Sequence, residues 1–233
     1  MMFRNKILLS FGFLILFSSL LPAQEEFIPQ VSFGVQGGLN NSFVNFVPGK
    51  RDPEITYHSI NRPMVGAYLC FIAEPYAGIQ VELNFANRGW KEIMDSSYTY
   101  VRTVDYFEIP LLTHLRFGKK HFRYVFNLGP YLGIHRSYQE SFEPFDAQTV
   151  LPEPDTNNYF GKRVDNLLEL GFALDAGLGY QTSAGLFMVK ARYSHGVTSI
   201  FTEYPEGQFR SSPWRNFFVG VSYQYNINLR KKK

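Results

Sequence analysis

The sequence predicts an all-β protein, an eight-stranded antiparallel up-and-down transmembrane β-barrel with four long extracellular loops and short periplasmic turns. Three observations favour this fold. Segments of about ten residues alternate between apolar and polar side chains, the connections between them alternate between short and long, and a leader typical of exported proteins precedes them.

The first 23 residues have the features of a secretory signal peptide. Arg4 and Lys6 precede an apolar run from Ile7 to Leu21, and cleavage is expected near Ala23. The run holds about 15 residues, fewer than the ~20 that a spanning helix needs. We therefore expect a signal peptide at 1–23, a barrel domain at 24–229 and a basic tail at 230–233.

Charge and composition narrow the function classes. Arg4 and Lys6 leave with the leader, so 21 of the 23 basic residues remain against 20 acidic ones, and the tail holds four of those 21. This balance predicts no nucleic-acid partner. The single cysteine excludes an intrachain disulfide. Phosphate-binding loops, nucleophile elbows and metal-ligand spacings are absent from the sequence, so no cofactor, metal site or catalytic residue is predicted.

Eight alternating segments define the predicted strands. In the last of them, Phe217, Val219 and Val221 alternate with Gly220 and Ser222. A soluble sheet would carry Lys, Glu and Thr on its polar face, whereas this face carries Gly and amides, as expected for a crowded polar lumen. The apolar face is therefore assigned to lipid. The predicted strands cover about 31–43, 63–73, 76–88, 102–117, 122–135, 166–180, 185–197 and 215–228.

The connections between these segments support the membrane assignment. Short turns are expected at Glu74-Pro75, 118–121 and 181–184, and long loops at 44–62, 89–101, 136–165 and 198–214. Outer-membrane barrels have tight periplasmic turns and long extracellular loops, and an even strand count returns both ends to the periplasm. A soluble lipocalin-like barrel would have a polar outside and an apolar lumen, which is the reverse of this pattern.

The lumen face carries charges of both signs. Burying an unpaired charge costs several kcal/mol, so these residues should pair into a network that fills a barrel too narrow for a wide channel. A path for protons or small solutes along the same residues is the alternative. The predicted network comprises Glu82, Arg88, Glu108, Arg116, Arg123, Glu169, Asp175, Lys190 and Arg192.

The last strand has a spacing that resembles the C-terminal signal read by the barrel-assembly machinery. Gly220 is followed by the aromatic residues Tyr223 and Tyr225. Phe218 stands where a polar residue is usual, and the chain continues to Lys233 beyond the aromatic residue. The same aromatics would also form a girdle at the periplasmic interface.

The third predicted loop, from Arg136 to Arg163, combines acidic and aromatic residues. A loop of this length is usually functional or disordered. It could contact a partner protein or bind divalent ions that bridge lipopolysaccharide, and a merely solvated loop is the alternative. The aromatic candidates for a partner site are Phe142, Phe145, Tyr159 and Phe160.

Several motifs resemble the PorT-like outer-membrane β-barrel proteins of the Bacteroidota. They are Phe33-Gly34-Val35-Gln36-Gly37-Gly38-Leu39-Asn40, Val81-Glu82-Leu83-Asn84-Phe85 with Arg88-Gly89-Trp90, Tyr106-Phe107-Glu108-Ile109-Pro110-Leu111-Leu112, and Leu128-Gly129-Pro130-Tyr131. The resemblance covers nearly all of the chain after the leader. It implies a porin-like barrel in the outer membrane, and the family's namesake is needed for export by the type IX secretion system. No functional residue carries over, because the matching motifs are structural.

Three functions follow as hypotheses. The first is a non-enzymatic accessory or scaffold, plausibly in protein secretion, whose partners would be outer-membrane lipid and lipopolysaccharide, the barrel-assembly machinery and secretion-system proteins. The second is a narrow porin or solute channel. The third is a lipid A-modifying enzyme, for which Ser194 and His195 with Ser199 and Glu203 are the nearest candidates. The charged lumen argues against a palmitoyltransferase, which would need an apolar pocket.

Overall fold

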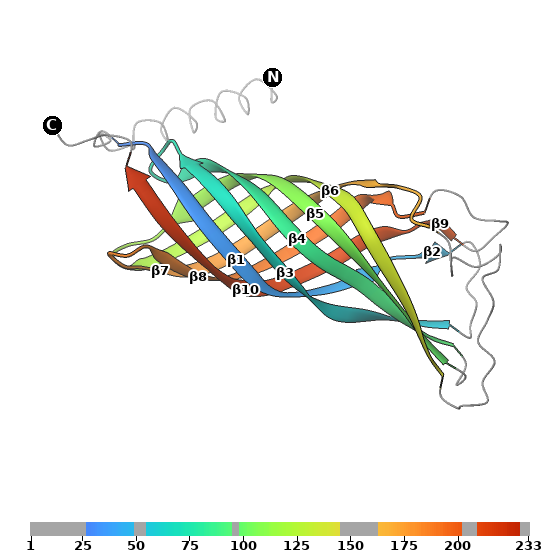
Figure 1. The fold of residues 1–233 in the computed structure, drawn as a ribbon. Helices are drawn as coiled ribbons and strands as arrows, with labels where there is room; N and C mark the ends of the chain where they lie inside the picture. Colours follow the sequence, from blue (N-terminus) through green and yellow to red (C-terminus); the bar gives the residue numbers. More distant parts are fainter. Residues whose placement is uncertain (1–26, 49–54, 95–97, 145–162, 202–208, 229–233) are drawn as a thin grey trace, which may run out of the picture.

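Eight long strands close into a barrel in the computed structural model, which describes residues 27–48, 55–94, 98–144, 163–201 and 209–228. All neighbouring strands are antiparallel, and β1 pairs with β10 to close the ring (Figure 1). The predicted eight-stranded fold is confirmed. The barrel strands are β1 (Gln30–Val44), β3 (Ile55–Ile72), β4 (Ala77–Met94), β5 (Tyr98–Phe117), β6 (Phe122–Pro144), β7 (Leu168–Gln181), β8 (Leu186–Ser199) and β10 (Pro213–Asn228).

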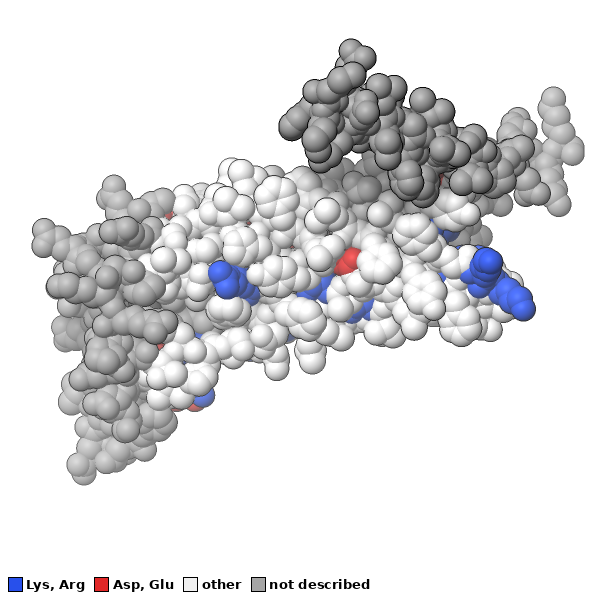
Figure 2. Space-filling model, turned by 180° about the vertical axis from the view of Figure 1, so that it is seen from behind, with Lys and Arg blue, Asp and Glu red and all other residues white. Residues whose placement is uncertain are grey.

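The alternation in the sequence becomes an apolar outside and a mostly polar inside. On β7, Leu170, Phe172 and Leu174 are exposed, whereas Glu169 and Asp175 are buried. Successive side chains on a strand point to opposite faces, so this period of two separates lipid-facing from lumen-facing positions. Figure 2 shows the resulting wall, in which uncharged side chains predominate and a few charged side chains are visible among them. Within the described ranges, no helix is long and apolar enough to cross a membrane.

The three short turns lie where the sequence places them, at the end of the barrel that also holds Gln30 and Asn228; we call this the turn end. The first turn is closed by mutual backbone hydrogen bonds between Glu74 and Ala77. The second needs left-handed backbone at Lys120, where φ is 56°, and at Gly118, where φ is 133°. The opposite end, which receives the remaining connections, is the loop end.

Four strands are longer than predicted by four or more residues, and their extra length is at the loop end. β3 begins at Ile55 rather than 63, β4 ends at Met94 rather than 88, β5 begins at Tyr98 rather than 102, and β6 ends at Pro144 rather than 135. Much of the sequence expected as loops at 44–62, 89–101 and 136–165 is therefore strand. Its alternation is inverted, with aromatics inside and polar residues outside, because this part of the sheet extends beyond the lipid.

These four strands form a sheet that projects from the loop end (Figure 1). At ~3.3 Å per residue and a tilt near 45°, the 23 residues of β6 rise about 50 Å, roughly twice the ~25 Å apolar band of such barrels. β6 pairs with β7 only as far as Ile134 but with β5 as far as Pro144. Among the described residues, positions 136–144 are thus paired on one side only. We call 55–60, 89–94, 98–104 and 136–144 the extension.

A row of polar side chains marks the outer border of the lipid-facing wall. Asn87 donates to Asp105 Oδ1 at 2.6 Å, and Ser137 donates to Asp105 Oδ2 at 2.6 Å. The next outward position on the turn-end side is aromatic, since Phe85 and Phe107 pack there with ring centroids 5.6 Å apart. Above this border a small second sheet pairs β2 (Val47–Pro48) with β9 (Phe209–Ser211).

Candidate functional site

The lumen is the most densely built part of the molecule, and its centre is an ion cluster around Glu82. Arg192 donates from Nε to Asp175 Oδ1 at 2.5 Å and from Nη2 to Glu82 Oε1 at 2.7 Å. The Lys190 Nζ lies 3.3 Å from Asp175 Oδ2 and 3.9 Å from Glu82 Oε1. All four side chains are at most 2% exposed. Two carboxylates and two cations balance, which offsets the cost of burying them. We call these four residues the Glu82 cluster.

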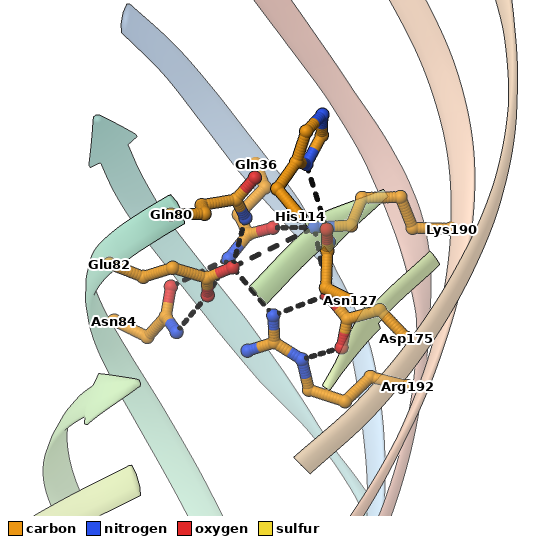
Figure 3. Close-up of polar contacts among 9 residues, drawn as sticks. All are labelled: Gln36, Gln80, Glu82, Asn84, His114, Asn127, Asp175, Lys190 and Arg192. Carbon is orange, nitrogen blue, oxygen red and sulfur yellow. Dashed lines mark hydrogen bonds and ion pairs between the residues drawn. The ribbon is translucent and has the colours of Figure 1, made fainter. Parts of the chain in front are cut away.

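The Glu82 cluster braces the barrel across its diameter. Arg192 lies on β8 and Glu82 on β4, and β7, β6 and β5 separate these two strands around the ring. Figure 3 shows the two carboxylates approaching the Arg192 guanidinium from different walls. The ion pairs of Glu82 therefore tie together strands that share no backbone hydrogen bonds, whereas Asp175 lies on β7, directly beside Arg192.

A shell of amides completes the Glu82 cluster (Figure 3). Gln36 donates to Glu82 at 2.8 Å and accepts from Lys190 at 2.8 Å. Gln80 and Asn84 donate to the same carboxylate at 2.6 and 2.8 Å. Asn127 donates to Asp175 at 3.2 Å, and its own Oδ1 lies 2.8 Å from His114 Nδ1. A carboxylate that accepts several hydrogen bonds keeps its charge at low cost in a buried site.

A second cluster lies nearer the loop end, around Arg88. This fully buried guanidinium donates to Glu108, and to Glu169 at 2.5 Å. Tyr131 also donates to Glu169 at 2.5 Å, so the second carboxylate has an additional donor. The Arg88 Cζ lies 4.9 Å from the Tyr106 ring centroid, a cation–π distance. We call Arg88, Glu108 and Glu169 the Arg88 cluster.

Aromatic side chains seal the loop end of the lumen. Trp90 and Trp214 are fully buried, with ring centroids 5.8 Å apart, and Trp214 donates to the Tyr106 hydroxyl at 3.2 Å. The buried members of this aromatic plug are Val44, Trp90, Tyr100, Val104, Tyr106, Val164, Ile200, Phe201 and Trp214.

The extension continues above the aromatic plug with one more ion pair. Arg102 lies 2.8 Å from Glu140 Oε1, which also accepts from Tyr100 at 2.7 Å. The Arg102 Cζ sits 4.4 Å from the Tyr138 ring centroid. Burial raises the pKa of the Tyr100 phenol far above its usual range, so this hydroxyl stays a neutral donor. The inner face of the extension is therefore packed along β4, β5 and β6, whereas Tyr57 of β3 is 42% exposed.

The turn end of the lumen is closed by apolar residues. Tyr68, Cys70, Ile72, Val125, Leu186 and Met188 form one buried cluster there. The inner face was expected to be polar along its whole length, and this apolar layer differs from that expectation. The sequence could have predicted this layer, because the apolar residues Cys70, Ile72 and Met188 occupy inward positions of the alternation.

The structure places seven of the nine predicted network residues in the two ion clusters. Arg116 and Arg123 lie at the turn end, and neither forms an ion pair within the described part of the chain. Arg123 instead donates to the carbonyls of Lys120 and Phe122 in the second turn. Both side chains are only partly buried, so their charges keep contact with solvent. The Arg102–Glu140 pair was not predicted, because Glu140 was expected in the loop 136–165, whereas Arg102 stands at the start of the predicted strand 102–117.

The residues of the predicted assembly signal divide between the two faces of β10. Tyr225 is 52% exposed on the outside, and Tyr223 also faces outward, donating to the Ala184 carbonyl at 2.5 Å. Gly220 faces the lumen, opposite Gly38 on β1. A Cβ at Gly220 would lie 2.4 Å from the Phe218 ring and 2.4 Å from the Gly37 carbonyl oxygen. Gly220 thus makes room for Phe218, whose unexpected apolar side chain is buried beside Met64 and Ala86.

The predicted loop site is only partly described. Phe142 belongs to β6 rather than to a loop, and its ring packs on Tyr100 at 5.1 Å. This half-buried ring serves the extension, which corrects its assignment to a free loop. Phe145, Tyr159 and Phe160 lie outside the described residues, as do the signal peptide and the basic tail.

Of the candidate hydrolase residues, Ser194 and His195 are not brought together, and Glu203 lies outside the described residues. Ser194 is buried on the lumen side of β8, whereas its neighbour His195 faces outward and stacks on Tyr193. A nucleophile and its base must lie within hydrogen-bond reach, and these two point to opposite faces. Over the described ranges, no three His, Cys, Asp or Glu side chains gather in a way that could hold a metal ion.

Comparison with known proteins identifies the type of barrel. Residues 23–202 match the model of the outer membrane protein beta-barrel domain family. The chain belongs to this family. It is an outer-membrane β-barrel with the lumen described above, and no curated protein matches its sequence.

Three solved protein structures illustrate the similarity of fold. The attachment invasion locus protein Ail of Yersinia pestis is 12% identical, with 85% of this chain and 100% of Ail covered and a TM-score of 0.40. OprG of Pseudomonas aeruginosa is 11% identical, with 83% and 95% covered and a TM-score of 0.42. The outer membrane protein AlkL is 12% identical, with 91% and 98% covered and a TM-score of 0.44.

Proposed function

We propose that this chain is a non-enzymatic, non-conducting outer-membrane barrel that acts as an accessory or scaffold protein, with protein secretion as its process. The observation that carries the proposal is the cross-braced lumen. Two buried ion clusters lie between apolar residues at both ends, and the inward side chains of these layers are almost inaccessible to solvent. A barrel filled in this way has no wide route for solutes, and its working surface is the outside.

The extension is the surface best suited to contact a partner. It projects beyond the lipid, its inner face is packed along β4 to β6, and β6 has one unpaired edge among the described residues over 136–144. An exposed sheet edge can accept a strand from another protein through main-chain hydrogen bonds. The resemblance of several motifs to the PorT-like proteins supports secretion as the process that such a partner serves.

Gene deletion tests the secretion part of the proposal. We expect the deletion strain to release less of its secreted cargo, and expression of the full chain to restore it. Normal cargo levels in the deletion strain would remove secretion from the proposal.

Site-specific cross-linking tests the scaffold part separately. A photoreactive side chain at Gln139, which is exposed on β6 of the extension, should cross-link a protein. The same group at Thr113, on the lipid-facing wall of β5, should not. Equal cross-linking at both positions, or none at Gln139, would contradict a scaffold role for the extension.

A further inference from the structure

An apolar groove runs along the outer wall near the turn end, where β1, β10, β8 and β7 are neighbours in the ring. Its volume is about 540 Å³. Gln36, Met188 and Ser222 contribute to it although their side chains face the lumen, so the floor is polypeptide backbone. Its sides are outward residues, among them Val35, Phe122, Tyr180, Val189 and Val221.

The groove exists because small residues lie between large ones. Gly37 occupies an outward position on β1, and an added Cβ there would meet nothing closer than Val65 Cγ1 at 3.6 Å. By contrast, a Cβ at the adjacent Gly38 would lie 2.3 Å from the Val219 carbonyl oxygen. Backbone approach therefore requires glycine at Gly38 but not at Gly37. The missing side chain at Gly37 keeps the groove open instead.

A basic turn adjoins the groove. Lys119 and Lys120 are exposed in the turn between β5 and β6, and the next residue, His121, stacks on Tyr180 with ring centroids 5.4 Å apart. Phe122 follows and packs edge-on against the same Tyr180 ring at 5.6 Å. The two ammonium groups thus stand on the turn whose aromatic residues form one side of the groove.

Charge at the turn end is predominantly positive. Among the described residues 72–77, 116–123 and 180–186, the charged side chains are Arg116, Lys119, Lys120 and Arg123 against Glu74 alone. Figure 2 shows Lys and Arg side chains gathered at this end of the wall, next to an uncharged surface. Aromatic side chains such as Tyr180 commonly lie at the level of lipid headgroups. The wall therefore carries the apolar groove first, then aromatic side chains and then cations. This order matches the acyl chain, glycerol region and phosphate of a phospholipid.

We propose that the groove and the basic turn bind one anionic phospholipid of the leaflet at the turn end. One acyl chain lies over Gly37, Val189 and Val221, and the Lys119 and Lys120 ammonium groups meet the phosphate headgroup. Short turns face the periplasm in barrels of this kind, so the lipid belongs to the periplasmic leaflet. Its negative headgroup is the source of selectivity, since the groove itself is apolar.

Native mass spectrometry of the full chain in detergent tests this site. Palmitoyl-oleoyl phosphatidylglycerol and phosphatidylethanolamine are added separately at equal concentration, and the retained lipid is counted as adducts. We expect phosphatidylglycerol to be retained more strongly. The double substitution Lys119→Gln with Lys120→Gln should lower its retention about thirtyfold, since each Lys near an anionic surface contributes about 1 kcal/mol and about 1.4 kcal/mol corresponds to a factor of ten. Retention of phosphatidylethanolamine should stay unchanged.

Substitutions in the outer wall distinguish lipid that is retained in the groove from lipid that is retained nonspecifically in detergent. Gly37→Phe should abolish retention of both lipids, and Val189→Phe provides a second filled groove if the first variant does not fold. Thr113→Phe, on the opposite wall, and the loop-end pair Lys91→Gln with Arg136→Gln should behave as the unchanged chain. Equal retention of the two lipids, unchanged retention in a folded groove variant, or an equal loss in Thr113→Phe would overturn the proposal. Folding of each variant is checked by its heat-dependent mobility on a gel.

Discussion

At the scale of single residues, Arg192 is the central brace of the lumen. It contacts carboxylates on two other strands, Asp175 on the neighbouring β7 and Glu82 across the barrel on β4. Removing one partner of a buried ion pair leaves an uncompensated charge, and this usually costs more than the pair itself contributes. Removal of Arg192 would leave the carboxylates of Glu82 and Asp175 without this partner, and the folded state would lose stability.

We therefore expect Arg192→Met to lower the free energy of unfolding by about 3–5 kcal/mol. Urea titration of the barrel refolded in lipid vesicles measures this change. Arg123→Met is the matched control, because Arg123 is half-exposed and contacts only turn carbonyls. It should cost about 1 kcal/mol or less. Similar losses in the two variants would show that the Glu82 cluster has no special role in stability.

Alternation was sufficient to predict which charged residues of the membrane-spanning strands face the lumen. It could not predict which charges meet, because pairing across a barrel depends on how far each strand is shifted along its neighbour. Arg88 and Arg116 have the same inward parity, yet Arg88 lies among carboxylates and Arg116 lies near the turn end. The amides that complete the Glu82 cluster, such as Gln36 and Asn127, were part of the polar pattern, and their bonding to carboxylates required the structure.

At the scale of elements, the seam between β1 and β10 depends on two facing glycines. Gly38 and Gly220 are paired, and a Cβ at either would approach backbone atoms at 2.3–2.4 Å. Backbone atoms in a closed ring cannot shift independently, so larger residues should strain the last pairing that closes the barrel.

Gly220→Ala should therefore destabilise the folded barrel by about 1–3 kcal/mol, measured as the folded fraction after refolding in detergent. Gly37→Ala, on the outward side of the same seam, should refold as the unchanged chain does. If Gly220→Ala refolds normally in detergent but fails to accumulate in cells, its role is recognition by the assembly machinery, and the packing explanation is wrong.

The extension is the element that the sequence analysis missed. Inside the lipid band the outward face is apolar, but beyond it Trp90 and Tyr100 point inward while Lys91 and Thr103 face outward. This reversed pattern is typical of a sheet in water. Because a membrane strand is expected to have an apolar outward face, such a segment was assigned to a loop. The polar row at Asn87 and Asp105 marks the point at which the pattern reverses.

Substitution of Arg102 should loosen the extension alone. Arg102→Met removes the ion pair with Glu140 while the two ion clusters of the lumen keep all of their partners. Hydrogen–deuterium exchange should then quicken in residues 89–94, 98–104 and 139–143 and stay slow in the rest of the barrel. Uniform acceleration across all eight strands would mean that the extension and the membrane-spanning part form one cooperative unit.

At the scale of the whole molecule, the barrel is closed by layers rather than by one plug. Apolar residues at the turn end, the Glu82 cluster, the Arg88 cluster and the aromatic plug follow one another along the lumen. Eight strands leave an interior just wide enough for side chains to fill. Because the lumen is filled, we propose that the protein acts through its outer surfaces, which are the extension and the lipid-facing wall.

Conductance across a planar lipid bilayer tests the filled lumen most directly. The purified full chain, inserted at high protein load and shown to be folded by its heat-dependent mobility, should give no discrete current steps in 1 M salt across the tested voltages. Reproducible steps of one size, with a fixed preference for cations or anions, would show a continuous path through both ion clusters and would contradict the account.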